Sequence, residues 1–196
     1  MEENTNVYTI GDRNIYLSGE INTKSTSEVI TKLMATITNI TNQARVIRDY
    51  EVGHINIFIQ SQGGSIHDMW ALIDLMMSSP VPIYTYAVGL TASAALKIFL
   101  AGAVRFVLPN SVLMYHELSA GNSGKLQNVA EWQDYLEKEQ EKVEKFVKMR
   151  THLKPKKLKE IKEKKLDYYI YPDEAIELGF ATDKFECPDW GEIIHG

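Results

Sequence analysis

The sequence has a single cysteine, Cys187, among its 196 residues. One cysteine cannot form an intrachain disulfide, which excludes a disulfide-stabilised secreted fold and fits the reducing cytosol. No apolar run reaches the length of about 20 residues that a transmembrane helix needs. The opening residues, MEENTN, are acidic and polar, unlike a secretory signal, whose central region is apolar. These absences predict a cytoplasmic protein with no membrane partner.

The chain also lacks an excess of positive charge. Its 21 lysines and arginines stand against 26 aspartates and glutamates, which gives a net charge of −5. This balance disfavours a nucleic-acid partner, because binding to the phosphate backbone depends on lysine and arginine. Internal repeats and low-complexity segments are absent as well. The length therefore predicts one domain with a sizeable core.

Strand-like apolar runs alternate with helical patterns in the first half of the chain. Strands are predicted at 14–17, 54–60 and 83–88. Helices are predicted from a cap at Ser25 or Ser27 to about Asn42, and from Ser65 to the prolines that begin at Pro80. Strand and helix in alternation are typical of an α/β domain with a largely parallel sheet.

The second half of the chain contains a long charged helix. It follows two short predicted strands, 104–108 and 111–116, and runs from about Lys125 to His152. Its length and polarity predict that it projects from the body, with one apolar side available to a second subunit. We divide the chain into a head (about 1–122 and 154–185), a handle helix (about 123–153) and a tail (186–196).

Ser93 lies where the third strand turns at Gly89 and leads into a helix of small and apolar residues. A strand-to-helix turn projects a hydroxyl outward, and the free N–H groups of the helix N-terminus point at the same region. That is the geometry of a nucleophilic serine beside an oxyanion hole. Serine is also a common helix N-cap, so a purely structural role is the alternative.

Five segments together resemble the Clp protease proteolytic subunit (ClpP), a self-compartmentalising serine peptidase. In the family's order they are 13–21 (RNIYLSGEI), 59–66 (IQSQGGSI), 89–95 (GLTASAA), 108–117 (LPNSVLMYHE) and 167–179 (DYYIYPDEAIELG). The resemblance covers about Asn14 to Phe185, with Gln62 where the family has proline. It implies an α/β fold of ClpP/crotonase-like repeated ββα units with a protruding long helix.

The same resemblance implies a catalytic triad. Ser93 is then the nucleophile, His116 the general base and Asp167 the group that orients the histidine. The backbone N–H groups of Gly64 and Ala94 form the oxyanion hole. An ordinary histidine titrates near 6.5, so neutral imidazole is available to accept the serine proton near neutral pH. This chemistry requires no metal and no cofactor.

The resemblance also implies a substrate class and partners. An unfolded polypeptide is expected to bind as an added strand, between an edge with Ser65 and Ile66 and an edge with Leu118 and Ser119. The implied assembly is a homo-oligomer, a heptameric ring or stacked rings around a chamber, which an AAA+ unfoldase could serve.

The sequence also allows three different interpretations. Lys97 lies one helical turn after Ser93, so a serine–lysine dyad is a possible chemistry. Against it, helical side chains lean toward the N-terminus, and a buried lysine would have to be neutral. A second interpretation is a crotonase-type acyl-CoA enzyme, whose related fold also forms oxyanion holes from backbone N–H groups. A third is a non-catalytic ring subunit.

Overall fold

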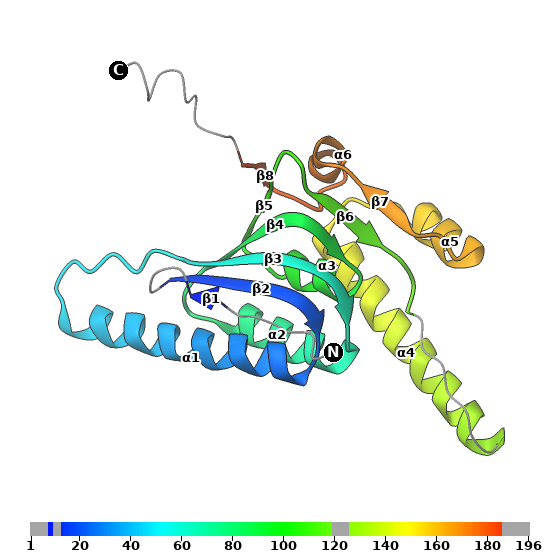
Figure 1. Cartoon of the computed structure of the whole chain (residues 1–196), viewed down its shortest axis with the longest axis horizontal. Helices are drawn as coiled ribbons and strands as arrows, with labels where there is room; N and C mark the ends of the chain where they lie inside the picture. Colours follow the sequence, from blue (N-terminus) through cyan, green and yellow to red (C-terminus); the bar gives the residue numbers. More distant parts are fainter. Residues whose placement is uncertain (1–7, 10–12, 119–125, 186–196) are drawn as a thin grey trace.

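The computed structural model describes residues 8–9, 13–118 and 126–185, with side chains over 13–118 and 131–185. Its elements follow in the order β1 (Tyr8–Thr9), β2 (Asn14–Ile21), α1 (Thr23–Val46), β3 (Ile55–Gly64), α2 (Ile66–Ser78), β4 (Ile83–Ala92), α3 (Ala94–Leu100), β5 (Val104–Val107), β6 (Val112–Tyr115), α4 (Leu126–Arg150), α5 (Pro155–Lys164), β7 (Tyr168–Ile170), α6 (Pro172–Glu177) and β8 (Asp183–Lys184) (Figure 1). The alternation of strands and helices confirms the predicted α/β class.

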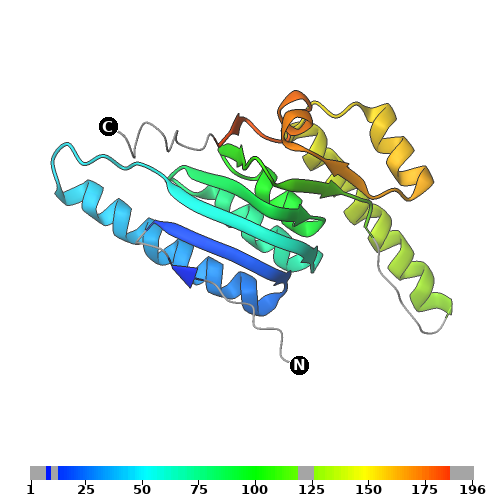
Figure 2. The ribbon, with the colours of Figure 1, turned by 45° about the horizontal axis from the view of Figure 1, so that its top comes forward.

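The sheet divides at β4. The main path runs β1-β2-β3-β4-β5-β8, parallel from β2 onward with β1 antiparallel at the edge. Residues 84–87 of β4 pair with β5, whereas residues 90–92 pair with β6. Gly89 lies between these two halves with a φ of +58°, an angle that glycine adopts without steric cost. Because β6 pairs in turn with β7, the strands before and after α4 meet beside the end of β4 (Figure 2).

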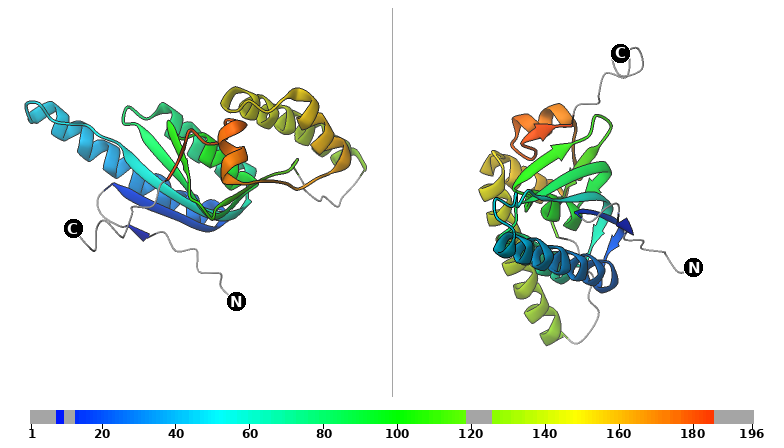
Figure 3. Two further views of the ribbon diagram at one scale, coloured as in Figure 1. Left: turned by 90° about the horizontal axis from the view of Figure 1, so that it is seen from above. Right: turned by 90° about the vertical axis from the view of Figure 1, so that its left-hand side faces the viewer.

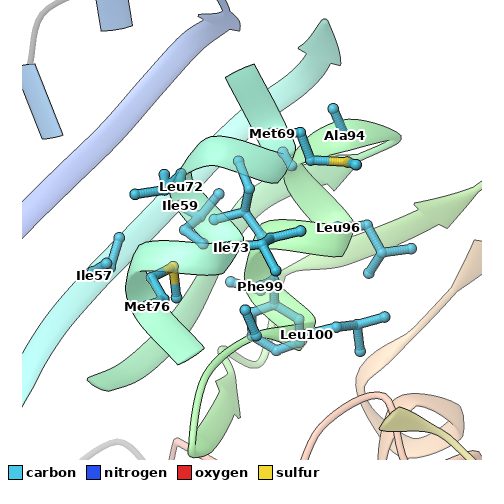
Figure 4. Close-up of a cluster of buried hydrophobic side chains, with 14 of the residues drawn as sticks. Ile57, Ile59, Met69, Leu72, Ile73, Met76, Ala94, Leu96, Phe99 and Leu100 are labelled. Carbon is cyan, nitrogen blue, oxygen red and sulfur yellow. The ribbon is translucent and has the colours of Figure 1, made fainter. Parts of the chain in front are cut away.

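Helices α1, α2 and α3 cover one face of the sheet, with α1 against β2 and α3 against β3 (Figure 3). The core lies in this interface, where Ile57 and Ile59 of β3 cluster with apolar side chains of α2 and α3 (Figure 4). Those side chains are Met69, Leu72, Ile73, Met76, Leu96, Phe99 and Leu100. All seven residues of α3 are buried. Burying an apolar side chain of this size contributes about 1.5–3 kcal/mol, so tertiary packing fixes the position of α3.

The opposite face of the sheet carries stacked aromatic rings. The ring of Tyr86 on β4 lies 4.5 Å from that of Phe58 on β3 and 4.8 Å from that of Phe106 on β5, measured between centroids. His54 stacks on Tyr84 in the same way at 4.0 Å. Cross-strand pairs of this kind stabilise strand register. They therefore help to fix β4, the strand that leads into Ser93.

The first helix begins earlier than the sequence pattern indicated. Asn22 is the N-cap of α1, and its side chain accepts a hydrogen bond from the Ser25 N–H (3.0 Å). The hydroxyl of Ser25 accepts a bond from the Asn22 N–H in return (3.1 Å), which completes a capping box. The expectation that Ser25 or Ser27 caps this helix was therefore wrong, because Ser25 is already inside its first turn. At the second helix the predicted cap is confirmed, since the Ser65 hydroxyl accepts from the Asp68 N–H.

The long helix α4 is anchored at its C-terminal half. Val143, Phe146 and Val147 are buried, and the Trp70 indole N–H donates to the Glu139 carboxylate (2.9 Å). The first half extends away from the sheet, as the sequence predicted (Figure 1). Within the described residues, no helix is both long enough and apolar enough to cross a membrane. The division into head, handle and tail stays a prediction, and residues 186–196 lie outside the described part of the chain.

Candidate active site

Ser93 occupies the junction between β4 and α3 in an unusual backbone conformation. Its φ is +54° and its ψ is −121°, a combination that costs a non-glycine residue energy and that clusters at functional sites. Although Ser93 is the residue before α3, its side chain makes no capping hydrogen bond. The interpretation of Ser93 as a structural cap therefore has no support in the described residues. The hydroxyl is left at a strained strand-to-helix turn, as in a nucleophile elbow.

Two glycines at the end of β3 pack closely on neighbouring backbone, and the first of them lies against this junction. A Cβ on Gly63 would come within 2.6 Å of the Ser93 Cβ and 3.0 Å of the Ala94 nitrogen. A Cβ on Gly64 would lie 2.2 Å from the Ile21 carbonyl oxygen. Both glycines also have positive φ, +106° and +149°. A side chain at either position would therefore meet both a steric clash and an unfavourable backbone conformation. Gly63 therefore packs directly on the Ser93–Ala94 turn, and Gly64 packs on the end of β2.

A hydrogen bond connects the junction to β6. The Ser93 N–H donates to the Met114 carbonyl oxygen (3.0 Å), one step beyond the last paired position of β4 and β6. Met114 is two residues before His116. The turn that carries the serine and the end of the strand that carries the histidine are therefore held side by side by backbone geometry alone.

His116 and Asp167 lie just beyond the same end of the β6–β7 pair. Tyr115 and Tyr168 are directly opposed in that antiparallel register, and His116 and Asp167 are the adjacent residue on each side. Both line a cavity of about 600 Å³, together with Met114, Glu117, Leu118, Leu136 and Lys165.

The environment of His116 lowers its pKa below the usual 6.5. Burial is the largest cause, because desolvation disfavours the imidazolium, and the charge of Lys97 acts in the same direction. The carboxylates of Asp167 and Glu117 oppose this shift without overcoming it. The neutral imidazole, which can accept a proton, is therefore the prevailing form at neutral pH.

The three segments that carry the expected triad residues are brought together, but no hydrogen bond joins their side chains in the described part of the chain. Within the described residues, no hydrogen bond connects the Ser93 hydroxyl to the His116 ring, or that ring to the Asp167 carboxylate. Asp167 is exposed to solvent. Catalytic hydrogen bonds are often long or misaligned until substrate is bound. The structure thus shows how the three segments are arranged, without a hydrogen-bonded path for a proton between their side chains in the described residues.

Comparison with known proteins identifies the family. The sequence model of the family described as Clp protease matches residues 2–185. The chain belongs to the Clp protease family. Proteolytic subunit 2 of the ATP-dependent Clp protease from Treponema denticola is 30% identical over 175 residues, which are 88% of this chain and 82% of the relative. Proteolytic subunit 1 from Rhodopirellula baltica is 26% identical over 182 residues, 89% of this chain and 75% of the relative.

A solved structure of the family shows the same fold. A mutant of ClpP1 from Listeria monocytogenes superposes with a TM-score of 0.75 at 21% identity, covering 91% of this chain and 94% of that one. The expected ClpP/crotonase fold, a parallel sheet with helices, is therefore confirmed, and so is membership of the Clp protease family.

Of the residues expected to bind substrate in this Clp family member, Leu118 lines the cavity beside His116. Ser65 is the N-cap of α2, and its N–H donates to the Ile21 carbonyl (2.7 Å); Ile66 begins the helix. The Leu118 N–H donates to the Gln140 side chain of α4 (2.8 Å). Ser119 lies outside the described residues. Gln140 was not singled out on the sequence, because only the packing of α4 brings it to this edge.

Lys97 is the residue for which the sequence left a catalytic role, in a serine–lysine dyad, as an open alternative. Its side chain is 1% exposed, and its amine lies 4.8 Å from the centroid of the Tyr115 ring. Burial lowers its pKa from 10.5 to about 7. Among the described residues we find no cluster of three or more histidine, cysteine, aspartate or glutamate side chains that could hold a metal.

Proposed function

We propose that this chain is a serine endopeptidase that hydrolyses peptide bonds of unfolded polypeptides through Ser93, His116 and Asp167. Its membership of the Clp protease family supports the reaction class. The observation that carries the proposal is the backbone of Ser93: a strained, uncapped turn whose N–H is bonded to the strand leading to His116.

The chemistry follows from the placement of these groups. His116 accepts the proton of the Ser93 hydroxyl as the oxygen attacks the substrate carbonyl, and Asp167 orients the imidazolium that forms. The N–H groups of Gly64 and Ala94 stabilise the tetrahedral oxyanion, where losing one donor typically costs about 2.7–4 kcal/mol of barrier. His116 then donates its proton to the leaving amine, and water hydrolyses the acyl-enzyme in a second round of the same steps.

The proposed substrate is an extended segment of unfolded polypeptide. It binds as an added strand between the Ser65–Ile66 edge and the Leu118–Ser119 edge. The proposed assembly is a heptameric ring or two stacked rings that enclose a chamber. Relatives described as proteolytic subunits of an ATP-dependent Clp protease support a partner AAA+ unfoldase. We place the assembly in the cytoplasm, in keeping with the single cysteine.

A fluorophosphonate probe tests the nucleophile. The assembled wild-type chain is expected to be labelled at Ser93, and Ser93→Ala to lose both the label and hydrolysis of an unfolded protein. Ser27→Ala, on an exposed face of α1, is the matched control and keeps both. A folded, assembled wild type that takes no label and cleaves nothing would refute the proposal.

A non-catalytic ring subunit is the second candidate. It is favoured by one observation, the exposed Asp167 that makes no hydrogen bond to His116. The mass of the assembly from light scattering, combined with fluorophosphonate labelling of Ser93, separates the two candidates. A ring that takes no label is the non-catalytic subunit. A labelled ring is the peptidase, and a monomer contradicts both. The family match favours either candidate over an acyl-CoA enzyme.

A further inference from the structure

Two cavities adjoin beside the expected triad residues. The first, of about 600 Å³, is the one lined by His116 and Asp167. The second, of about 630 Å³, lies between α4 and α5. Glu117 and Lys165 line both cavities, so the second begins where the first ends. A polypeptide held at His116 therefore lies next to the second cavity.

The second cavity has a surplus of positive charge. Among the described residues, four lysines and three glutamates line it. The carboxylate of Glu144 is shared by Lys148 (3.5 Å) and Lys162 (3.8 Å). Glu163 pairs with Lys159 (3.6 Å). These ion pairs leave the lining with more ammonium groups than carboxylates.

Lys165 is the cavity lysine whose charge is not matched. Its side chain is exposed, and it makes no ion pair in the part of the chain that the structure describes. Glu117, the other residue common to both cavities, makes no ion pair there either. The place where the two cavities adjoin therefore presents one available amine and one available carboxylate.

The backbone of Lys165 is also unusual for a lysine. Its φ and ψ, both +49°, are left-handed. Its N–H donates to the Lys162 carbonyl (3.2 Å) and the Leu166 N–H to the Ile161 carbonyl (3.0 Å), which closes α5 in a Schellman motif. Glycine is the usual residue at this position, because it has no Cβ to strain. Attraction to the helix dipole does not require the lysine, since Lys162 and Lys164 already lie in the last turn. Non-glycine residues in such conformations cluster at functional sites.

We propose that Lys165 is a specificity-determining residue: its amine binds the carboxylate of an aspartate or glutamate in the substrate polypeptide, in the lysine-lined cavity next to His116. This inference rests on the proposed peptidase function. An acidic side chain in that cavity gains an ammonium partner, whereas a basic one is repelled by the surplus of lysines. Exposure to solvent and the charge of Glu117 limit the gain. An acidic sequence is therefore expected to be cleaved roughly two- to fivefold faster than its neutral counterpart.

Quenched-fluorescence peptides test this preference on the assembled wild-type chain. The peptides share one sequence and carry either glutamate or glutamine at a single position, which is moved along both sides of the cleaved bond. The readout is the ratio of kcat/KM for the glutamate peptide to that for the glutamine peptide. At one position this ratio is expected to be roughly 2–5 and to fall towards one in about 0.5 M salt, because salt screens exposed charges.

Three variants assign the preference to its residue. Lys165→Gln is expected to bring the ratio to about one, and Lys165→Glu to bring it below one. Lys164→Gln is the matched control and keeps the wild-type ratio, because Lys164 pairs with Glu160 (3.0 Å) and lines neither of the two cavities. A change in activity that affects both peptides equally cancels in the ratio.

Lys165→Gly separates specificity from folding. Glycine suits the left-handed backbone, so this variant is expected to melt at a temperature no lower than that of the wild type and still to lose the preference. A Lys165→Gly variant that keeps the wild-type ratio overturns the inference.

The outcomes distinguish this inference from the proposed function. A wild type that cleaves glutamate and glutamine peptides equally at every position overturns the inference and leaves the peptidase intact. So does a preference that survives Lys165→Gln. A wild type that cleaves neither peptide refutes the peptidase, and fluorescence anisotropy with the same peptides then decides the inference. Tighter binding of the glutamate peptide that Lys165→Gln abolishes supports it, and equal binding or none overturns it.

Discussion

His116 and Asp167 lie beyond the same end of an antiparallel strand pair, although 50 residues of chain and the whole of α4 and α5 separate them. Strand register brings them to this end, because Tyr115 pairs with Tyr168 and each of the two is the next residue along its chain segment. A similar constraint acts between Ser93 and β6 through the bond to the Met114 carbonyl. Backbone pairing therefore gathers the candidate residues before any side chain is considered.

Replacing Asp167 tests this relationship. Asp167→Asn keeps the shape and removes the charge that holds the histidine tautomer, so peptide hydrolysis is expected to fall by about 10²–10⁴-fold. Asp173→Asn, on an exposed carboxylate that pairs with Lys184 at the surface, is the control and leaves the rate nearly unchanged. If Asp167→Asn hydrolysed peptides as fast as the control, Asp167 would have no part in catalysis.

The glycine that touches the serine is predicted to be irreplaceable. Gly63→Ala places a methyl group 2.6 Å from the Ser93 Cβ at a φ of +106°, so the turn must move, and labelling of Ser93 is expected to fall at least about tenfold. Gly89→Ala is the matched control. It also has positive φ, but its new Cβ meets nothing closer than 3.6 Å.

The control variant should therefore incur only backbone strain of about 1–2 kcal/mol and keep its label. Probe labelling with chemical denaturation of both variants separates the two effects. Equal loss of label in the two would show that strain alone, and not contact with Ser93, accounts for the result.

The buried lysine makes stability depend on pH. Folding lowers the Lys97 pKa from 10.5 to about 7, so between these values the unfolded chain holds a proton that the folded chain lacks. Stability therefore rises with pH through this window, and the whole penalty is present below it. For a shift of about 3.5 units the penalty is at most about 5 kcal/mol.

Lys97→Met is thus expected to be more stable than wild type near pH 7 and to lose most of this advantage near pH 10. Denaturant unfolding at several pH values gives the difference between the two proteins, in which groups common to both cancel. An advantage that is the same at both ends of the window would contradict the shift.

Arg105 is predicted to hold the C-terminal segment onto the sheet. Its buried guanidinium donates to the carbonyls of Phe180 (2.7 Å), Gly179 (3.1 Å) and Arg150 (3.3 Å). Arg105→Met leaves these carbonyls without a donor, which is expected to cost about 2–4 kcal/mol of unfolding free energy. Arg48→Ala, whose side chain is 96% exposed, is the control with little effect. A melting temperature for Arg105→Met equal to that of the control would refute this role.

Much of the architecture could be predicted because its signals are local. The apolar periodicity and the prolines and glycines between elements indicated the order of strands and helices, and the Ser65 cap was read from residues three apart. The start of α1 was misplaced, because Asn22 and Ser25 are both good caps and only the exchange of hydrogen bonds between them decides which is the N-cap. A local pattern that allows two solutions is resolved by the surrounding packing.

The sequence by itself determined the α/β class, the family resemblance and the identity of the candidate nucleophile, since each rests on short local patterns and their order along the chain. Only the tertiary structure decided that Ser93 is an uncapped, strained turn and that Gly63 packs against it. It alone also brought His116 and Asp167 to the same end of the β6–β7 pair and buried Lys97 beside Tyr115. The physical reason is that strand register, burial and electrostatic environment are properties of contacts between distant segments, and these exist only after the sheet and helices have packed.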